Sequence, residues 1–304
     1  MATGLDPLPE LKWHARASTC YFQFCMGSVQ PIGSLLREWR QRRHVSQLAL
    51  ACDANISARH LSFLETGRSQ PSREMVLLLA ERLDIPLRER NSLLVAAGFA
   101  PAFPQRPLTD PALEIIRKAI DVVLTGHEPY PAIAVDRHRT LISCNSAVLP
   151  LLAGIDPALI CPPMNTLRFT MHPGGLAPRI PNYREWRLHV LAKLGREVEV
   201  SGDPVLVELL RELCEYPVPD GLVDGKCSRD GDLHSLVLPF QLATDAGVLS
   251  FFSTTTVFGT PIEVTLSEIF LECFYPADAT TAEALRTMAA AREGRLASSP
   301  KFSS

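Results

Sequence analysis

Apolar residues recur every three or four positions from residue 32 to residue 97. In the first segment, 32–43, the repeat is carried by Leu35, Leu36 and Trp39. This spacing places apolar side chains on one face of an α-helix. The same pattern continues through 46–67, 72–83 and 87–97. Because the segment 46–67 holds two short helices, we expect a bundle of five helices.

The segment 46–67 has the pattern of two short helices joined by a tight turn. Ser46 and Ser57 are N-cap residues, and Asn in the 53–56 turn tolerates the left-handed backbone conformation. Apolar side chains face the core, and small or basic side chains are left exposed at the start of the second helix. The inward residues are Leu48, Leu50, Ala51, Leu61 and Leu64, and the outward ones are Ala58, Arg59, His60 and Ser62. An exposed helix start of this kind fits the major groove of DNA.

The pattern changes after four prolines in 101–111, which predict a linker over 104–112. Beyond it, a helix in 113–124 precedes a hairpin formed by AIAVD and TLISCN, with Asp136 at its turn. Helical patterns follow in 147–152, 183–194 and 205–216, then strands in 235–242 and 247–257, and a last helix in 282–293. Helices mixed with strands around one sheet predict an α+β sensor domain.

The strand in 247–257 is apolar on both faces. Val248 and Phe252 point one way, whereas Leu249 and Phe251 point the other way. One face is expected to pack on helices, and the other to line a cavity for a small apolar ligand.

Length and charge support two domains with different partners. The chain has 304 residues, of which 46% are hydrophobic and 21% charged, and no apolar run is long enough to span a membrane. The net charge is −3, but 31–100 contains ten arginines against seven acidic residues, which leaves 20 basic and 26 acidic residues elsewhere. The net positive charge is therefore confined to the helical segment, where DNA phosphates would lie. Arg42, Arg43 and Arg68 belong to this basic set.

The eight cysteines contain no C-x-x-C pair, and Cys20 and Cys25 are spaced unfavourably for a metal site. They indicate reduced thiols in a cytoplasmic protein, with a cysteine-based sensor as the alternative. The sequence also lacks H-E-x-x-H, G-x-S-x-G and phosphate-loop motifs, so we expect neither an enzyme nor a metal or cofactor site.

The first resemblance covers residues 32 to about 103. Ser46-Gln47, Ser57 and the run Leu64-Glu65-Thr66-Gly67-Arg68 resemble the XRE-type helix-turn-helix domain of phage-repressor-like regulators. The resemblance implies that Arg40 pairs with Glu65 and holds the helices in place. It also implies a set of DNA contacts: Gln47, Ser57, Ala58, Arg59, His60 and Phe63.

The second resemblance covers residues 111 to about 290. AVDRHRTLISCN, TMHPGGLAP and FFSTTTVFGTPIEVTLSEIFLECFYPAD are similar to the ligand-binding domain of MmyB-like regulators, which has a PAS-like fold. This resemblance implies a small hydrophobic, fatty-acid-like ligand. Candidate head-group residues are Asn145, Arg168, His172 and Arg179, with Phe252 as an apolar contact. The alternative for Asn145 and His172 is that they fix loops through backbone hydrogen bonds, and for the arginines it is surface placement.

The domain prediction is an N-terminal extension at 1–30 without ordered structure, a helix-turn-helix domain at 31–103, a linker at 104–112, a ligand-binding domain at 113–293 and a disordered tail at 294–304. Translation starting at Met26 is an alternative to Met1. We expect a cytoplasmic, homodimeric transcription regulator that binds double-stranded DNA and a small apolar molecule. Two alternatives stay open: a protein-interaction adaptor, and a PAS-like sensor that holds haem or flavin.

Overall fold

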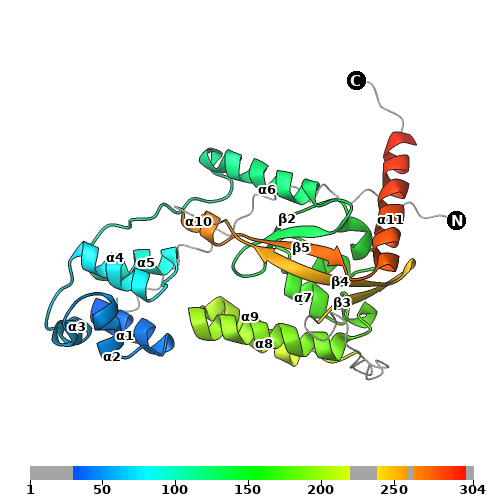
Figure 1. Ribbon diagram of the computed structural model, residues 1–304. Coiled ribbons are helices and arrows are strands. Elements are labelled where there is room, and N and C mark those ends of the chain that lie inside the picture. The colour runs from blue at the N-terminus through cyan, green and yellow to red at the C-terminus, as the bar shows by residue number, and fades with distance from the viewer. Residues whose placement is uncertain (1–29, 220–237, 259–262, 299–304) are drawn as a thin grey trace.

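The computed structural model describes residues 30–219, 238–258 and 263–298. The predicted N-terminal extension, with the question of Met1 or Met26, lies outside these residues apart from Gln30. Figure 1 shows a helical domain at one end of the molecule and a larger domain built around a sheet. No helix in the described part of the chain is long and apolar enough to cross a membrane.

The helical domain consists of the five predicted helices. Their bounds are α1 Ile32–Arg42, α2 Gln47–Asp53, α3 Ala58–Glu65, α4 Arg73–Arg82 and α5 Leu87–Ala96. Leu50, Ala51, Leu61 and Leu64 are buried as expected. Leu48 is 65% exposed, contrary to the prediction, because it lies about 200° around the helix from Leu50.

Close packing of α1 on α3 depends on Gly33. A Cβ atom at this position would lie 2.3 Å from the backbone oxygen of Leu64 and 2.7 Å from that of Glu65. Both oxygens belong to the last turn of α3, which cannot shift without moving the helix. Gly33 therefore fixes the distance between α1 and α3.

The second domain is built on one antiparallel sheet of five strands in the order β2-β1-β5-β4-β3. The strands are β1 Ala132–Val135, β2 Leu141–Cys144, β3 Phe240–Thr244, β4 Gly247–Thr256 and β5 Phe270–Pro276. The predicted β1–β2 hairpin is confirmed, and Asp136 Oδ1 accepts hydrogen bonds from the backbone N–H groups of His138 and Thr140 across its turn. Together with its helices, the sheet confirms the α+β class.

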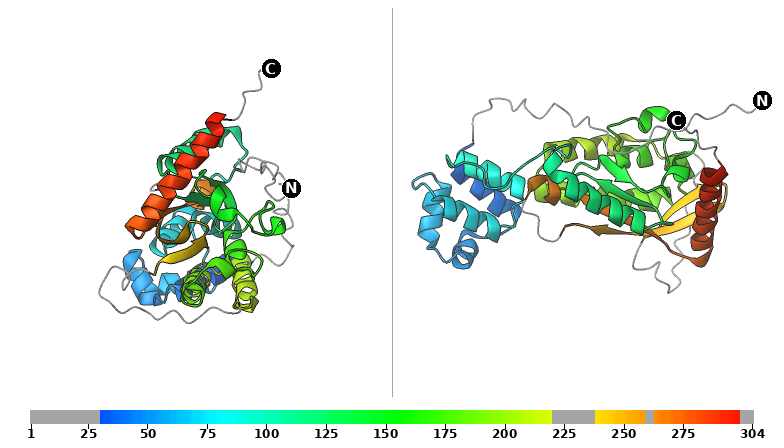
Figure 2. Two further views of the ribbon diagram at one scale, coloured as in Figure 1. Left: turned by 90° about the vertical axis from the view of Figure 1, so that its right-hand side faces the viewer. Right: turned by 90° about the horizontal axis from the view of Figure 1, so that it is seen from above.

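Helices cover both faces of the sheet (Figures 1 and 2). Their bounds are α6 Glu114–Gly126, α7 Thr166–Met171, α8 Tyr183–Ser201, α9 Pro204–Glu215, α10 Val264–Ser267 and α11 Ala279–Ser298, with 3-10 turns at Pro111–Leu113, Leu149–Leu152, Pro157–Leu159 and Ala177–Arg179. α6 packs on Ala132, Ala134 and Leu271. Ile133, Val135 and Phe251 face the opposite side and form the larger core.

The helix predicted over 147–152 is a 3-10 turn at Leu149–Leu152, and the last helix is longer than predicted. α11 continues to Ser298, so residues 294–298 are helical, although they were predicted to be part of a disordered tail. Its alanine-rich sequence favours helix, and Asp278 Oδ1 accepts from the N–H of Thr281 at its start. The proline linker also lies against α10. Pro104 O accepts from Val264 N at 2.9 Å, and Arg106 N donates to Glu263 Oε1 at 2.8 Å.

Candidate DNA-binding surface and ligand pocket

The start of α3 is exposed and its backbone is capped. Ser57 Oγ accepts from His60 N at 3.1 Å, and Ser46 Oγ caps α2 in the same way. Asn55, in the turn between the helices, has a φ of 53°, as its residue type predicts. The caps and the turn hold the two helices at a fixed angle and leave the side chain of Arg59 in solvent.

Glu65 connects the three helices of this unit. Its carboxylate accepts two hydrogen bonds from Arg40, at 2.6 and 2.9 Å, and one from Gln47 Nε2 at 2.8 Å. Burial alone would raise the pKa of Glu65, but the hydrogen bonds from Arg40 and Gln47 outweigh it, so this pKa is lowered. The structure thus brings together Arg40 and Glu65 as the sequence suggested, and it orients Gln47 at the start of α2.

Two arginines flank one aromatic ring on the α3 side of the domain. The guanidinium carbon of Arg59 lies 5.3 Å from the ring centroid of Phe63, and that of Arg68 lies 5.8 Å from it. Contacts of this kind restrict a long side chain while leaving its charge available. Phe63 therefore serves as a support on which both basic side chains are held.

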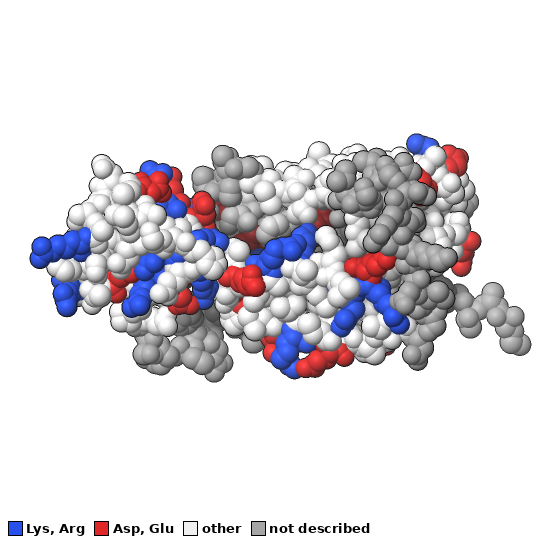
Figure 3. Space-filling view, turned by 60° about the horizontal axis from the view of Figure 1, so that its bottom comes forward, with Lys and Arg blue, Asp and Glu red and all other residues white. Residues whose placement is uncertain are grey.

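Arg42 and Arg43 have protein partners elsewhere. Arg42 Nη1 donates to Ser201 O of the second domain at 2.8 Å, and Nη2 pairs with Glu38 at 2.5 Å. Arg43 donates to the backbone oxygens of Leu83 and Asp84. These contacts do not support the predicted role of the two residues in binding phosphate. Figure 3 shows basic side chains on the visible surface of the helical domain, with acidic side chains among them.

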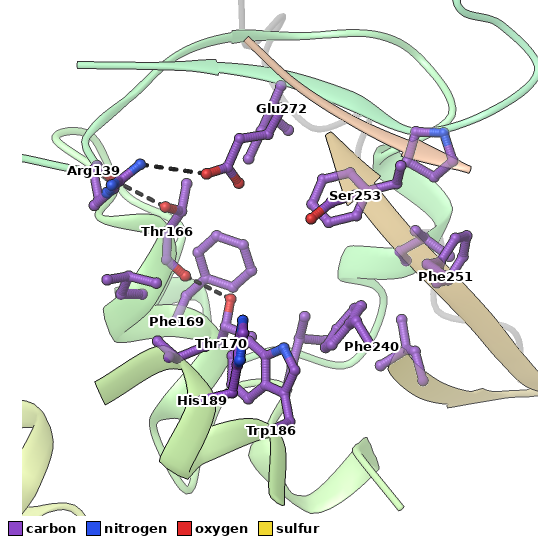
Figure 4. Close-up of a pocket in the computed structure, with 18 of the residues that line it drawn as sticks. Arg139, Thr166, Phe169, Thr170, Trp186, His189, Phe240, Phe251, Ser253 and Glu272 are labelled. Atoms are coloured by element: carbon purple, nitrogen blue, oxygen red, sulfur yellow. Dashed lines mark hydrogen bonds and ion pairs between the residues drawn. The ribbon is translucent and has the colours of Figure 1, made fainter. Parts of the chain in front are cut away.

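A cavity of about 200 Å³ lies between the sheet and helices α7 and α8 (Figure 4). Its apolar wall includes Trp186 of α8, Phe240 of β3 and Phe251 of β4. The ring centroids of Trp186 and Phe240 are 5.3 Å apart, and Phe240 and Phe251 stack at 6.3 Å. Three other lining residues, His189, Lys193 and Ser253, are exposed, so the cavity is open to solvent on that side.

The polar end of the cavity is organised by Arg139, whose side chain is only 8% exposed. Its guanidinium pairs with Glu197 of α8 and, at 3.4 Å, with Glu272 of β5. Its backbone oxygen accepts from Thr166 N at 2.8 Å and from Thr166 Oγ1 at 3.1 Å, and Thr166 also lines the cavity (Figure 4). Arg139 has a φ of 68°, in the left-handed region, at the end of the hairpin turn, and its side chain lines the cavity.

None of the ligand contacts suggested by the sequence lines this cavity. Asn145 bonds to the backbone of Leu124, Tyr130 and Ala132, which is the loop-fixing alternative. His172 Nδ1 accepts from Gly174 N in the same manner.

The other three suggested contacts also have different partners. Arg168 pairs with Glu212 of α9, and Arg179 donates to backbone oxygens that include Ala243 O. Phe252 stacks on Tyr275, with ring centroids 5.2 Å apart, on the sheet face opposite the cavity. The alternation in β4 was read correctly, but the cavity lies on the side of Phe251.

The residues that sequence reasoning missed are Arg139, Glu197 and Glu272. Only Glu272 lies among apolar neighbours, which is a weak signal of a buried polar group, whereas Arg139 and Glu197 stand in polar segments that give no such signal. These three residues are far apart in the sequence, and only the folded structure shows that they form one cluster.

Comparison with protein families matches residues 116–288, more than half of the chain, to the MmyB-like transcription regulator ligand binding domain. Residues 36–90 match the helix-turn-helix family. A search among curated proteins finds no match. Among solved structures, an RNA-binding light-oxygen-voltage receptor is similar at 14% identity with a TM-score of 0.22, and the match covers 85% of this chain and 64% of the receptor chain, less than two thirds of it.

Proposed function

This chain belongs to the family of MmyB-like transcription regulators, and on that premise we propose that α3 reads a specific DNA site while the cavity binds a small apolar, fatty-acid-like molecule. DNA binding and a ligand-binding domain are the properties of the two matched families. The reading residues, the ligand class and the dimeric state are our proposal.

The observation that supports the DNA contacts is the exposed, capped start of α3. Ser57, Ala58, Arg59 and His60 form this helix start, with Gln47 at the start of α2. Arg59 projects into solvent, where it can donate two hydrogen bonds to a guanine edge. Phe63 and Arg68 contribute support and a phosphate contact from the following turn.

The apolar walls of the cavity support the ligand class. The volume of about 200 Å³ is somewhat larger than a cavity of about 150 Å³ that holds benzene in another protein. It therefore suits a short alkyl chain, and a longer chain would extend through the open side past Ser253 and His189. A polar head group would lie at Arg139, Thr166 and Thr170, where hydrogen-bonding side chains line the cavity.

We propose that the active species is a homodimer. One helical domain contacts too few base pairs for specific affinity, whereas two copies on a near-palindromic site double the contacts. The ligand would act by binding one arrangement of the two copies more tightly than the other.

The test uses the full chain and a site selected from random duplex DNA. Arg59→Ala is expected to weaken binding to the selected site by about 1 to 3 kcal/mol and to flatten base preference, as measured by fluorescence anisotropy. Arg286→Ala is the control, because this exposed residue of α11 pairs only with Glu283 in its described contacts. Unchanged base preference in Arg59→Ala would refute the assignment of α3.

Ligand binding is tested separately with saturated fatty acids from octanoate to hexadecanoate. Calorimetry is expected to detect binding, and mass spectrometry of co-purified molecules identifies the natural ligand. Binding of haem or flavin, visible as an absorbance band of the purified protein, would favour the alternative of a cofactor sensor. DNA binding that is insensitive to salt would favour an interaction adaptor.

A further inference from the structure

The β1–β2 turn, residues 136–140, lies between the ligand cavity and the DNA-binding domain. Two arginines leave this turn in different directions. Arg139 enters the cavity, whereas Arg137 reaches toward the helical domain. Only His138 separates them in the sequence, so both arginines belong to the same short turn.

Arg137 lies among three carboxylates that belong to different elements. Nη1 is 3.5 Å from Glu89 of α5 and 3.5 Å from Glu268, and Nη2 is 3.4 Å from Asp203 at the start of α9. Arg137 is 22% exposed and Glu89 is 28% exposed, so water screens their attraction only in part. Arg137 therefore connects the ligand-binding domain to the DNA-binding domain.

β5 repeats the same arrangement. Glu268, two residues before β5, accepts two hydrogen bonds of 2.7 Å from Arg88 of α5. Glu272, four residues later, faces the cavity and pairs with Arg139. The turn and β5 are thus joined by two ion pairs: Arg139–Glu272 at the cavity and Arg137–Glu268 at the domain interface.

Polar contacts join the two domains beside a cleft. A cleft of about 700 Å³ separates the domains and is lined by Trp39, Glu89, Arg137 and Asp203 among others. Beside it, Arg42 Nη1 is bonded to Ser201 O, and a Cβ atom on Gly202 would lie 1.9 Å from that nitrogen. Polar contacts around a cleft can rearrange with less loss of free energy than an apolar core.

We propose that the β1–β2 turn transmits occupancy of the cavity to α5 of the DNA-binding domain. This inference rests on the proposed function, because it assigns the regulation of the proposed ligand site. A ligand carboxylate that binds Arg139 competes with Glu272 and Glu197 for the guanidinium. The turn then shifts, and Arg137 changes its distance from Glu89 and Glu268, which alters how α5 is held.

Hydrogen exchange of the full chain tests this proposal without knowledge of ligand or DNA site. Arg139→Gln and Glu272→Gln remove one charge each at the cavity and touch no residue of α5 in the described contacts. Both are expected to speed amide exchange of α5 by about three- to tenfold. Ser253→Ala is the control, since it also alters the cavity wall but lies on β4, outside the ion pairs; its α5 exchange should equal that of the unmodified protein.

Octanoate supplies the second measurement. In the unmodified protein it is expected to change α5 exchange, and in Arg137→Gln it should still bind with similar affinity but leave α5 unchanged. Unaltered α5 exchange in Glu272→Gln would overturn the proposal. This second variant keeps the test decisive even if Arg139→Gln fails to fold. The weaker DNA binding expected of Arg59→Ala is measured independently, so failure of the proposed function is distinguished from failure of the transmission.

Discussion

Arg40 and Glu65 form a bidentate ion pair within the helix-turn-helix domain, with side chains only 11% and 2% exposed. They lie 25 residues apart in the sequence, on α1 and α3. The pair therefore fixes the distance between these helices through charge as well as packing.

Removing one partner of this pair is expected to destabilise the folded protein. Glu65→Ala leaves the Arg40 guanidinium buried without its carboxylate and should lower the free energy of unfolding by about 3 to 5 kcal/mol. Glu38→Ala is the matched control, because Glu38 pairs with Arg42 at a site where its side chain is 43% exposed, and it should cost less than about 1 kcal/mol. Urea unfolding followed by circular dichroism measures both, and equal losses would contradict the role of Glu65.

Gly33→Ala is expected to destabilise the helical domain by about 1 to 3 kcal/mol, because its Cβ would collide with the backbone of α3. Gly126→Ala, in α6, is the control: a Cβ there meets nothing within 4 Å, so the change should be neutral or slightly stabilising. Thermal unfolding distinguishes the two variants, and a neutral Gly33→Ala would show that α1 and α3 can separate freely.

The ionised Asp203 carboxylate should stabilise the protein, and acid should remove this contribution. Burial alone would raise its pKa, but the hydrogen bond with His138 and the charge of Arg137 outweigh burial and lower the pKa to about 2, from an ordinary 3.8. The ionised carboxylate thus contributes about 2 kcal/mol above pH 3.8, and this contribution is lost as the pH falls toward 2. In Asp203→Asn the fall in unfolding free energy between pH 4 and 2 should be smaller by about that amount. The same dependence of unfolding free energy on pH in both proteins would refute the role of the Asp203 carboxylate.

Filling the cavity should separate ligand binding from DNA binding. Ser253→Leu places a branched side chain at the open side and is expected to weaken octanoate binding by about tenfold or more, with DNA affinity in the absence of ligand unchanged. Thr254→Leu is the control, because the next residue of β4 points to the opposite face of the sheet. Calorimetry compares the two, and equal affinities would place the ligand elsewhere.

The helix-turn-helix unit was predictable because its determinants are local. Ser46, Ser57 and Asn55 act through their own backbone neighbourhood, so caps and turn follow from residue type and spacing. Likewise, the two-residue alternation of β4 predicted opposite faces for Phe251 and Phe252.

The position of the cavity was decided by tertiary structure. Alternation gives two faces but cannot tell which one α8 leaves partly open, so Phe252 was chosen where Phe251 lines the cavity. The positive charge of Arg42 suits a phosphate contact. In the folded chain, however, its guanidinium donates a hydrogen bond to Ser201 O. The sequence by itself determined most of the helices and strands and the helix-turn-helix unit, because short-range hydrogen bonds and periodicity set them. Only the fold determined the cluster of Arg139, Glu197 and Glu272, because contacts between distant residues depend on how the layers pack.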